Sequence, residues 1–158
     1  MKIPTSRLIW LAASLALVAS HSRAACSNQT LHGKYAFTVT GQILTPPPVA
    51  GPVSGVAMTT FDGSGGLMQV DHVIHNGALP VEAWRPASGS YSLNADCTGW
   101  MTIVPHPSNP ADGSPELKLY IVVTRDGNIV NTVVSGAPLL PAFSANILSN
   151  GIRKESDE

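Results

Sequence analysis

Tight-turn signals recur along most of this 158-residue chain. Glycine stands beside Asp or Asn at 62–66, 76–77 and 126–128, a composition typical of the turns that join antiparallel strands. Beyond residue 25, the intervening segments are rich in Val, Ile, Thr and aromatic residues. None of them keeps a helical apolar period for more than about two turns. This pattern favours an all-β domain and argues against a helical bundle.

The strand-like segments number eight or nine. Because long open sheet edges promote aggregation, we expect them to close into an antiparallel eight-stranded barrel, with a sandwich as the alternative. If 79–84 forms a ninth strand, the long loops 44–52 and 105–115 lie at opposite ends of the barrel. If it does not, the two loops flank one opening. The other expected strands cover 33–42, 53–61, 67–75, 88–94, 100–105, 116–124, 129–135 and 142–149.

The first 24 residues have the features of a secretory signal peptide. Lys2 and Arg7 precede an apolar run at 8–18, and Ser22 and Ala24 place small residues at the cleavage site. The apolar run is too short to anchor the chain across a bilayer. We therefore expect a secreted or periplasmic protein with no membrane anchor.

The mature chain is expected to form one domain over 25–152, followed by a polar tail at 153–158. Lipidation of Cys26 is the competing interpretation of this N-terminus. Lipoproteins usually carry an aliphatic residue three positions before that cysteine, where this chain has Arg23. Cleavage without lipidation is therefore favoured.

Cys26 and Cys97 are the two cysteines of the chain. In an oxidising compartment a disulfide between them is the default expectation, and no CxxC motif suggests a redox thiol. Asn28 begins a glycosylation sequon, which matters only in a eukaryotic host.

The charge of the mature chain argues against polyanionic partners. Three of the nine Lys and Arg residues lie in the signal peptide, so six remain against ten Asp and Glu residues. No basic patch is available to neutralise phosphates, and we expect neither nucleic acid nor anionic membranes as partners.

Two histidines and an acid fall close together at 71–75. His72 and His75 are three residues apart, and odd spacing on a strand sends side chains to opposite faces. Asp71 and His75 share a face but lie about 13 Å apart along it. We therefore expect no metal site and no cofactor, and retain both histidines as ligand contacts.

Elimination narrows the acidic residues that lack a structural explanation. Four of them occupy turn contexts, where their side chains bind local backbone: Asp62, Asp96, Asp112 and Asp126. Three acids in the domain are left without such an explanation: Asp71, Glu82 and Glu116. Asp71 lies in the middle of an expected strand. Asp71 is a candidate catalytic residue if its face is the interior, whereas the neighbouring Gln69 suggests a solvated exterior.

Glu82 is the second candidate catalytic residue, with an exposed ion pair to Arg85 as the simpler interpretation. No nucleophile elbow or phosphate-binding loop accompanies these acids.

Aromatic residues supply the other candidate ligand contacts. The inward positions of an eight-stranded barrel can be packed solid or can enclose one small ligand. Many strand positions here carry Ala, Ser, Thr, Val or Gly, and small inward side chains leave room for a cavity. The candidate ligand contacts are Tyr35, Phe37, His72, His75, Trp84, Tyr91 and Trp100.

Four stretches carry a resemblance to a known family. They are CSNQTLHGKYAFTVTG, FDGSGGLMQVDHVIHNG, SGSYSLNADCTG and GNIVNTVVSG. They resemble small exported β-proteins associated with the allene oxide cyclase-like barrel, a calycin-type eight-stranded fold. The resemblance implies a fold that supports cofactor-free cyclases and apolar-ligand binding, and it assigns no catalytic residue.

Three functions remain after this elimination. The first is binding of a small, mostly apolar molecule inside the barrel. The second is a cofactor-independent isomerase or cyclase acting on an unsaturated lipophilic substrate, with Asp71 or Glu82 moving a proton. The third is a surface or matrix interaction module that acts through its loops, with an apolar patch near 46–48 or Trp84.

Overall fold

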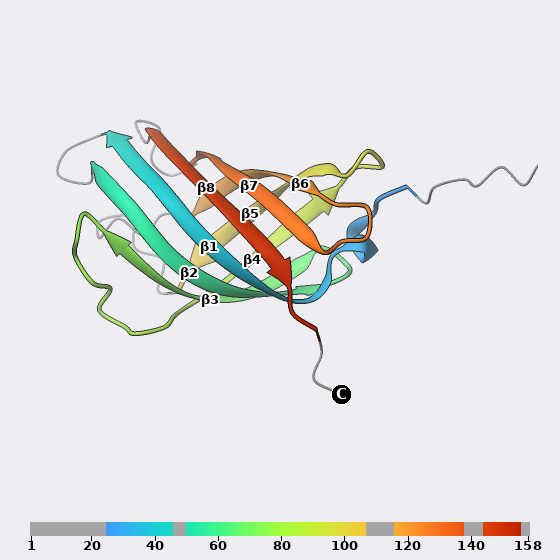
Figure 1. Ribbon diagram of the computed structural model, residues 1–158, viewed down its shortest axis with the longest axis horizontal. Helices are drawn as coiled ribbons and strands as arrows, with labels where there is room; N and C mark the ends of the chain where they lie inside the picture. The colour runs from blue at the N-terminus through green and yellow to red at the C-terminus, as the bar shows by residue number, and fades with distance from the viewer. Residues whose placement is uncertain (1–24, 46–49, 107–115, 138–143, 156–158) are drawn as a thin grey trace, which may run out of the picture.

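Eight antiparallel strands close into a barrel in which every strand pairs with its neighbours in the chain (Figure 1). The computed structural model describes residues 25–45, 50–106, 116–137 and 144–155. A short 3₁₀ helix, η1 (Asn28–Thr30), precedes the first strand. The strands are β1 (His32–Thr45), β2 (Gly51–Asp62), β3 (Gly66–His75), β4 (Arg85–Leu93), β5 (Thr98–Pro105), β6 (Leu117–Val123), β7 (Ile129–Gly136) and β8 (Ser144–Arg153).

The all-β class, the closed eight-stranded barrel and the disulfide are confirmed. The expected signal peptide and most of the polar tail lie outside the described residues, although β8 runs through Arg153, the first residue of that tail. Within the described ranges, no helix is both long enough and apolar enough to cross a membrane.

The alternative ninth strand at 79–84 is wrong, because this segment is a loop between β3 and β4. Asn76 and Gly77 do form a tight turn with positive φ angles of 50° and 77°. After this turn only Ala78 pairs back to His75, as an isolated bridge. The β1–β2 and β5–β6 connections therefore leave the barrel at the same end, which we call the open end.

The interior follows from the two-residue period of the strands. On β6, Leu119, Ile121 and Val123 are buried, whereas the alternate residues Lys118 and Tyr120 are exposed. The same alternation continues through every strand. Every second side chain along a strand therefore points inward and contributes to a single core inside the barrel.

Three aromatic rings fill the opposite end, which we call the closed end. Phe61 lies between Tyr35 and Tyr91, with centroid distances of 5.2 and 5.0 Å and nearly perpendicular planes. This edge-to-face geometry is the favoured one for aromatic pairs. All three rings are at most 2% exposed, so this half of the barrel is solid.

Helix η1 covers the closed end and is tied to the strands by hydrogen bonds. The Tyr91 hydroxyl lies 3.0 Å from the Asn28 carbonyl and 2.9 Å from the Leu31 carbonyl. Burial raises the pKa of Tyr91, which keeps this hydroxyl protonated as a donor. The Asn28 side chain accepts from the Leu93 amide and donates to the Ser64 carbonyl, so the sequon asparagine is engaged in the fold.

Arg153 completes this end from the last strand. Its Nε donates to the Tyr35 hydroxyl at 2.9 Å, its Nη2 donates to the Thr30 carbonyl at 2.9 Å, and its guanidinium lies over the Tyr35 ring. The Tyr35 hydroxyl in turn donates to the Gly127 carbonyl at 2.5 Å. These contacts join β1, β8, η1 and the β6–β7 turn.

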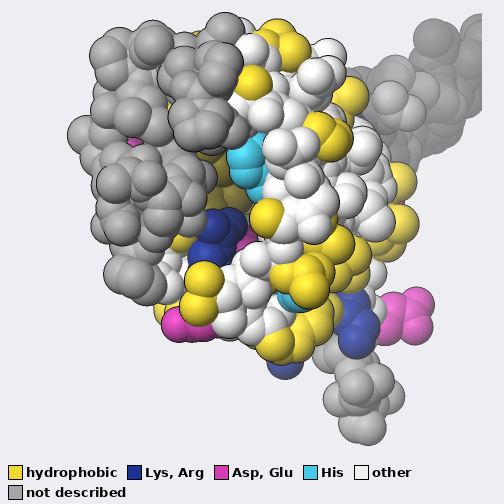
Figure 2. Space-filling model, turned by 90° about the vertical axis from the view of Figure 1, so that its left-hand side faces the viewer, with side chains coloured by type: hydrophobic (Ala, Val, Ile, Leu, Met, Phe, Trp, Pro, Cys, Tyr) yellow, Lys and Arg dark blue, Asp and Glu magenta, His cyan; other side chains and the backbone are white. Residues whose placement is uncertain are grey.

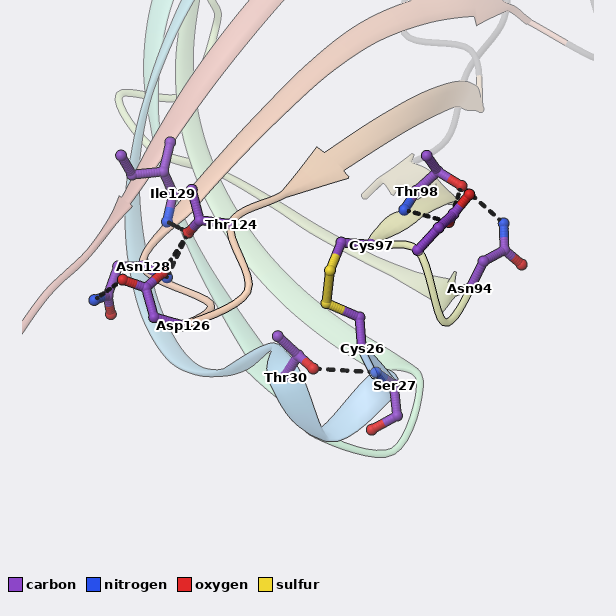
Figure 3. The surroundings of a disulfide bond; sticks show 11 residues. Cys26, Ser27, Thr30, Asn94, Cys97, Thr98, Thr124, Asp126, Asn128 and Ile129 are labelled. Carbon is purple, nitrogen blue, oxygen red and sulfur yellow. Dashed lines mark hydrogen bonds between the residues drawn. A yellow bond between two sulfur atoms is a disulfide. The ribbon is translucent and has the colours of Figure 1, made fainter. Parts of the chain in front are cut away.

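The disulfide joins the segment before η1 to the β4–β5 turn (Figure 3). It links Cys26 and Cys97 across a sequence separation of 71 residues. Beside it, the Cys26 amide donates to the Ala95 carbonyl at 3.1 Å. Both cysteines are buried, so the bridge is part of the closed-end core.

Acidic residues hold the turns of the closed end, as predicted from the sequence. Asp62 Oδ1 accepts hydrogen bonds from the amides of Ser64, Gly65 and Gly66 at 2.7–2.9 Å. Asp96 and Asp126 accept in the same way from the amides two residues later. The fourth residue of this prediction, Asp112, lies outside the described residues.

Replacing both cysteines should lower the stability of the barrel without changing its fold. In the chain-entropy model, opening a loop of this length costs about 4 kcal/mol. We expect Cys26→Ala/Cys97→Ala to show that loss in urea denaturation, and the reduced wild type to match the variant. A loss below about 1 kcal/mol would show that η1 and its hydrogen bonds close this end without help from the disulfide.

Asp62 should make the fold sensitive to acid. Its three backbone hydrogen bonds lower its pKa from 3.8 to about 2, so its stabilising contribution is present above pH 3.8 and is lost as the pH falls through about 2. We expect Asp62→Asn to show a shallower fall in Tm than the wild type between pH 4 and 2. Glu155→Gln is the control for removal of an exposed charge, and an equal slope in Asp62→Asn and wild type would contradict the prediction.

Candidate ligand-binding cavity

A cavity of about 500 Å³ occupies the open half of the barrel. This volume lies within the range of roughly 300–1,000 Å³ that is typical of small-molecule sites. Figure 2 faces the open end and shows a hollow in which a basic side chain and a histidine are visible. The apolar strand residues that line it are Phe37, Val39, Ile43, Val53, Ala57, Val73, Met101, Ile103, Pro105, Leu117, Leu119, Val134 and Ile147.

The cavity exists because aliphatic side chains replace aromatic ones above the closed end. Phe37 lies at this boundary: its ring covers Gly151 on the neighbouring strand, where an added Cβ would come within 2.4 Å of ring carbons. Toward the open end, β1 and β2 present Val39 and Val53, which fill less of the interior. The β3–β4 loop adds Leu79, Pro80, Val81 and Glu82 to the lining.

A chain of polar side chains crosses one wall of the cavity. Thr59 donates to Gln69 Oε1 at 2.9 Å, and Gln69 Nε2 donates to Asp71 Oδ2 at 3.0 Å. Arg85 Nε donates to Asp71 Oδ1 at 3.1 Å, and its Nη2 donates to Oδ2 at 3.3 Å. A carboxylate can only accept, so the Gln69 amide nitrogen must face Asp71.

Asp71, the first candidate catalytic residue, faces the interior and is 3% exposed. Its strand register explains the ion pair, because Asp71 on β3 lies opposite Arg85, the first residue of β4. Gln69 shares the inner face with it and lines the same cavity. Gln69 therefore marks a polar interior wall, and not the solvated exterior that its chemistry suggested.

Glu82, the second candidate catalytic residue, is exposed in the β3–β4 loop at the cavity mouth. The structure brings Glu82, Asp71 and Arg85 to one cavity, but the ion pair observed at Arg85 is with Asp71.

The two histidines lie on opposite faces of β3, as their odd spacing predicts. His75 lines the cavity, and its Nε2 is buried with no hydrogen-bond partner among the described residues. His72 is on the outer face, where its Nδ1 lies 2.7 Å from the Ala83 carbonyl and its ring lies 6.2 Å from that of Trp84. Trp84 itself is 57% exposed.

The remaining candidate ligand contacts lie in three places: the cavity wall, the closed-end core and the outer face of the barrel. Phe37 lines the cavity, whereas Tyr35 and Tyr91 belong to the closed-end core below it. Trp100 lies on the outer face of β5, 39% exposed, and pairs across the strands with Tyr120. The structure therefore brings Phe37, Asp71, His75 and Glu82 together and places the other five candidates elsewhere.

Sequence reasoning missed a second polar wall. Thr132 on β7 lies opposite Ser149 on β8, and their hydroxyl oxygens are 2.6 Å apart. Both residues line the cavity. Their alternation with outward residues was visible in the sequence, but nothing local indicated which face was inside. The sequence predicts Arg85 as a partner of Glu82, whereas its observed ion pair is with Asp71.

No group of three or more His, Cys, Asp or Glu residues in the described ranges is arranged to hold a metal ion.

The Asp71–Arg85 pair should be tested by a double-mutant cycle. Arg85→Met leaves Asp71 buried without its counter-ion and should lower the free energy of unfolding by about 2 kcal/mol, a value reduced for the partial exposure of Arg85. Asp71→Asn/Arg85→Met should cost less than Arg85→Met alone, because it leaves no unpaired charge inside. Additive losses in chemical denaturation would argue against an interaction between the two side chains.

Comparison of the chain with protein-family models, with curated proteins and with solved structures gives no match.

Proposed function

We propose that this protein is exported and binds a small, mostly apolar molecule inside its barrel. The observation that carries the proposal is the cavity of about 500 Å³ in the open half, lined mainly by aliphatic side chains. Burying about 200 Å² of apolar ligand surface there contributes about 5 kcal/mol before the entropic cost of association. The polar walls would orient the ligand.

Three further observations support export and this mode of binding. The Cys26–Cys97 disulfide is typical of oxidising compartments, and the N-terminal 24 residues have signal-peptide features. The turn motifs resemble those of the allene oxide cyclase-like barrels, a calycin-type fold that supports cofactor-free cyclases, and related barrels hold apolar ligands. A loop-based interaction module would need no interior space, and we rank that alternative last.

A second candidate function, a cofactor-independent isomerase or cyclase, is favoured by one observation. A buried carboxylate, Asp71, faces an apolar cavity, which is the arrangement that abstraction of a proton from a lipophilic substrate would need. Both of its oxygens already accept hydrogen bonds from Arg85 and Gln69. This network orients the carboxylate and neutralises its charge, which serves ligand positioning as well as it serves catalysis.

Filling the cavity should abolish binding of a neutral fluorescent probe such as N-phenyl-1-naphthylamine. Val134 and Ile147 face the cavity, whereas their chain neighbours Val133 and Leu148 face outward. We expect the inward variant Val134→Trp/Ile147→Trp to weaken binding at least tenfold in a fluorescence titration. The outward variant Val133→Trp/Leu148→Trp is the matched control and should bind as the wild type does. Failure of the wild-type protein to bind any neutral apolar probe would refute the proposed function.

The catalytic alternative predicts a specific effect of Asp71→Asn. This variant keeps a hydrogen-bonding group beside Gln69 and Arg85 but cannot take up a proton. With an unsaturated fatty-acid epoxide that also cyclises spontaneously, the wild type should give one enantiomer of the product and the variant a racemate, measured by chiral chromatography. A racemate from the wild type itself would leave binding as the better description.

A further inference from the structure

The two polar walls of the cavity lie on opposite sides of the barrel. Gln69 is on β3 and Thr132 is on β7, and strands four apart in an eight-stranded barrel face each other across the interior. Each wall consists of side chains that bind one another, but the hydrogen-bonding capacity of neither wall is used up. What each wall still offers to the interior defines the chemistry of an occupant.

The Thr132–Ser149 pair retains one donor. Two hydroxyl groups carry two O–H hydrogens, and the 2.6 Å contact between the oxygens uses one of them. The other hydrogen belongs to whichever hydroxyl accepts in this contact, either Thr132, which is 5% exposed, or Ser149, which is half-buried, and it has no acceptor among the described residues. An unpaired donor in such a site costs about 1–3 kcal/mol, so a partner from the cavity is strongly favoured.

The opposite wall retains a donor of the same kind. Gln69 Nε2 carries two hydrogens, and one of them binds Asp71 Oδ2. The second has no acceptor among the side chains and backbone that the structure describes, while the amide oxygen already accepts from Thr59. Both walls therefore present an N–H or O–H donor, and an acceptor oxygen on the occupant can bind either wall. The hydroxyl oxygens of Thr132 and Ser149 can in addition accept a hydrogen bond.

The charges around the cavity disfavour an anionic occupant. Among the described residues, the lining holds two carboxylates, Asp71 and Glu82, one guanidinium, Arg85, and the two imidazoles of His75 and His106. Arg85 is engaged with Asp71, and that pair contributes no net charge. An anion entering this apolar space would lose its hydration and meet a net negative lining.

We propose that the occupant is a neutral, mostly apolar molecule that carries a carbonyl or ether oxygen, and that this oxygen accepts a hydrogen bond from the Thr132–Ser149 pair. This inference rests on the proposed binding function and specifies its ligand class. The hydroxyl pair would set orientation and selectivity, while the aliphatic walls supply most of the affinity.

The test uses three probes of similar length, octane, octan-2-one and octanoate, in competition with N-phenyl-1-naphthylamine. Thr132→Val/Ser149→Ala removes the inner hydroxyl pair with little change of shape. We expect it to weaken octan-2-one about three- to tenfold, the range of one neutral hydrogen bond, and to leave octane within about twofold. Wild-type protein should bind octanoate at least tenfold more weakly than octan-2-one.

A matched control exists on the outer face of the same barrel. Ser90 and Thr102 also lie opposite each other across two strands, with hydroxyl oxygens 3.2 Å apart, and neither lines the cavity. Ser90→Ala/Thr102→Val therefore removes an equivalent pair and should leave the affinity for all three probes within about twofold. Melting temperatures of both double variants show whether the barrel is intact.

The outcomes separate this inference from the function it rests on. If octane and the fluorescent probe bind but octan-2-one binds equally well to both double variants, the hydrogen bond from the Thr132–Ser149 pair to the ligand oxygen is refuted. The binding function then stands. Preferential binding of octanoate would refute the neutral ligand class. If neither octane nor the fluorescent probe binds to the wild type, the proposed function fails, and the ligand class fails with it.

Discussion

Closure of the sheet is the constraint on which the rest of this structure depends. Once eight strands pair in a ring, the width of the interior is fixed, and the sizes of the inward side chains decide which parts are solid. At the closed end Tyr35, Phe61 and Tyr91 meet edge to face and leave no space. Toward the open end the same strands present aliphatic residues such as Val39 and Val53, and a cavity results. The barrel is therefore hollow only where its inward side chains are small, although the sheet itself is continuous.

Polar groups inside such a barrel are stable only where they bind one another. Burial of Asp71 is offset by two hydrogen bonds from Arg85 and one from Gln69, and the last of these fixes the orientation of the Gln69 amide. The network therefore does two things: it allows a carboxylate to sit at an apolar wall, and it leaves a single amide hydrogen for an occupant. Catalysis by Asp71 would require a substrate atom to compete with these donors, whereas binding leaves the network intact, which is why we favour binding.

The sequence predicted what depends on local structure and on the two-residue period. Strands, turns, the Cys26–Cys97 bridge and the role of Asp62 as a turn acceptor all follow from residues close together or from the cysteine count. The inner face of β3 could not be predicted, because the period shows which residues share a face but not which face is inside. The polar side chain of Gln69 suggests a solvent-facing position, whereas in the structure it lines the cavity and bonds to Thr59 and Asp71. The Asn76–Gly77 turn that the sequence predicts is present, but beyond it only Ala78 pairs back to β3. The segment 79–84 is therefore a loop and not a ninth strand.

The two ends of the barrel differ in their contribution. The closed end carries the contacts that stabilise the fold, and the open end contains the mouth of the cavity. The closed-end turns at 63–65, 94–97 and 124–128 are short and held by acidic side chains, and the disulfide and η1 join them to the strands. The cavity opens at the other end, where the connections between strands are longer. In the binding function that we propose, a ligand would enter through this end without disturbing the aromatic core or the bridge. Its selectivity would depend on side chains in mid-barrel, the Thr132–Ser149 pair and Gln69, and not on the open-end connections.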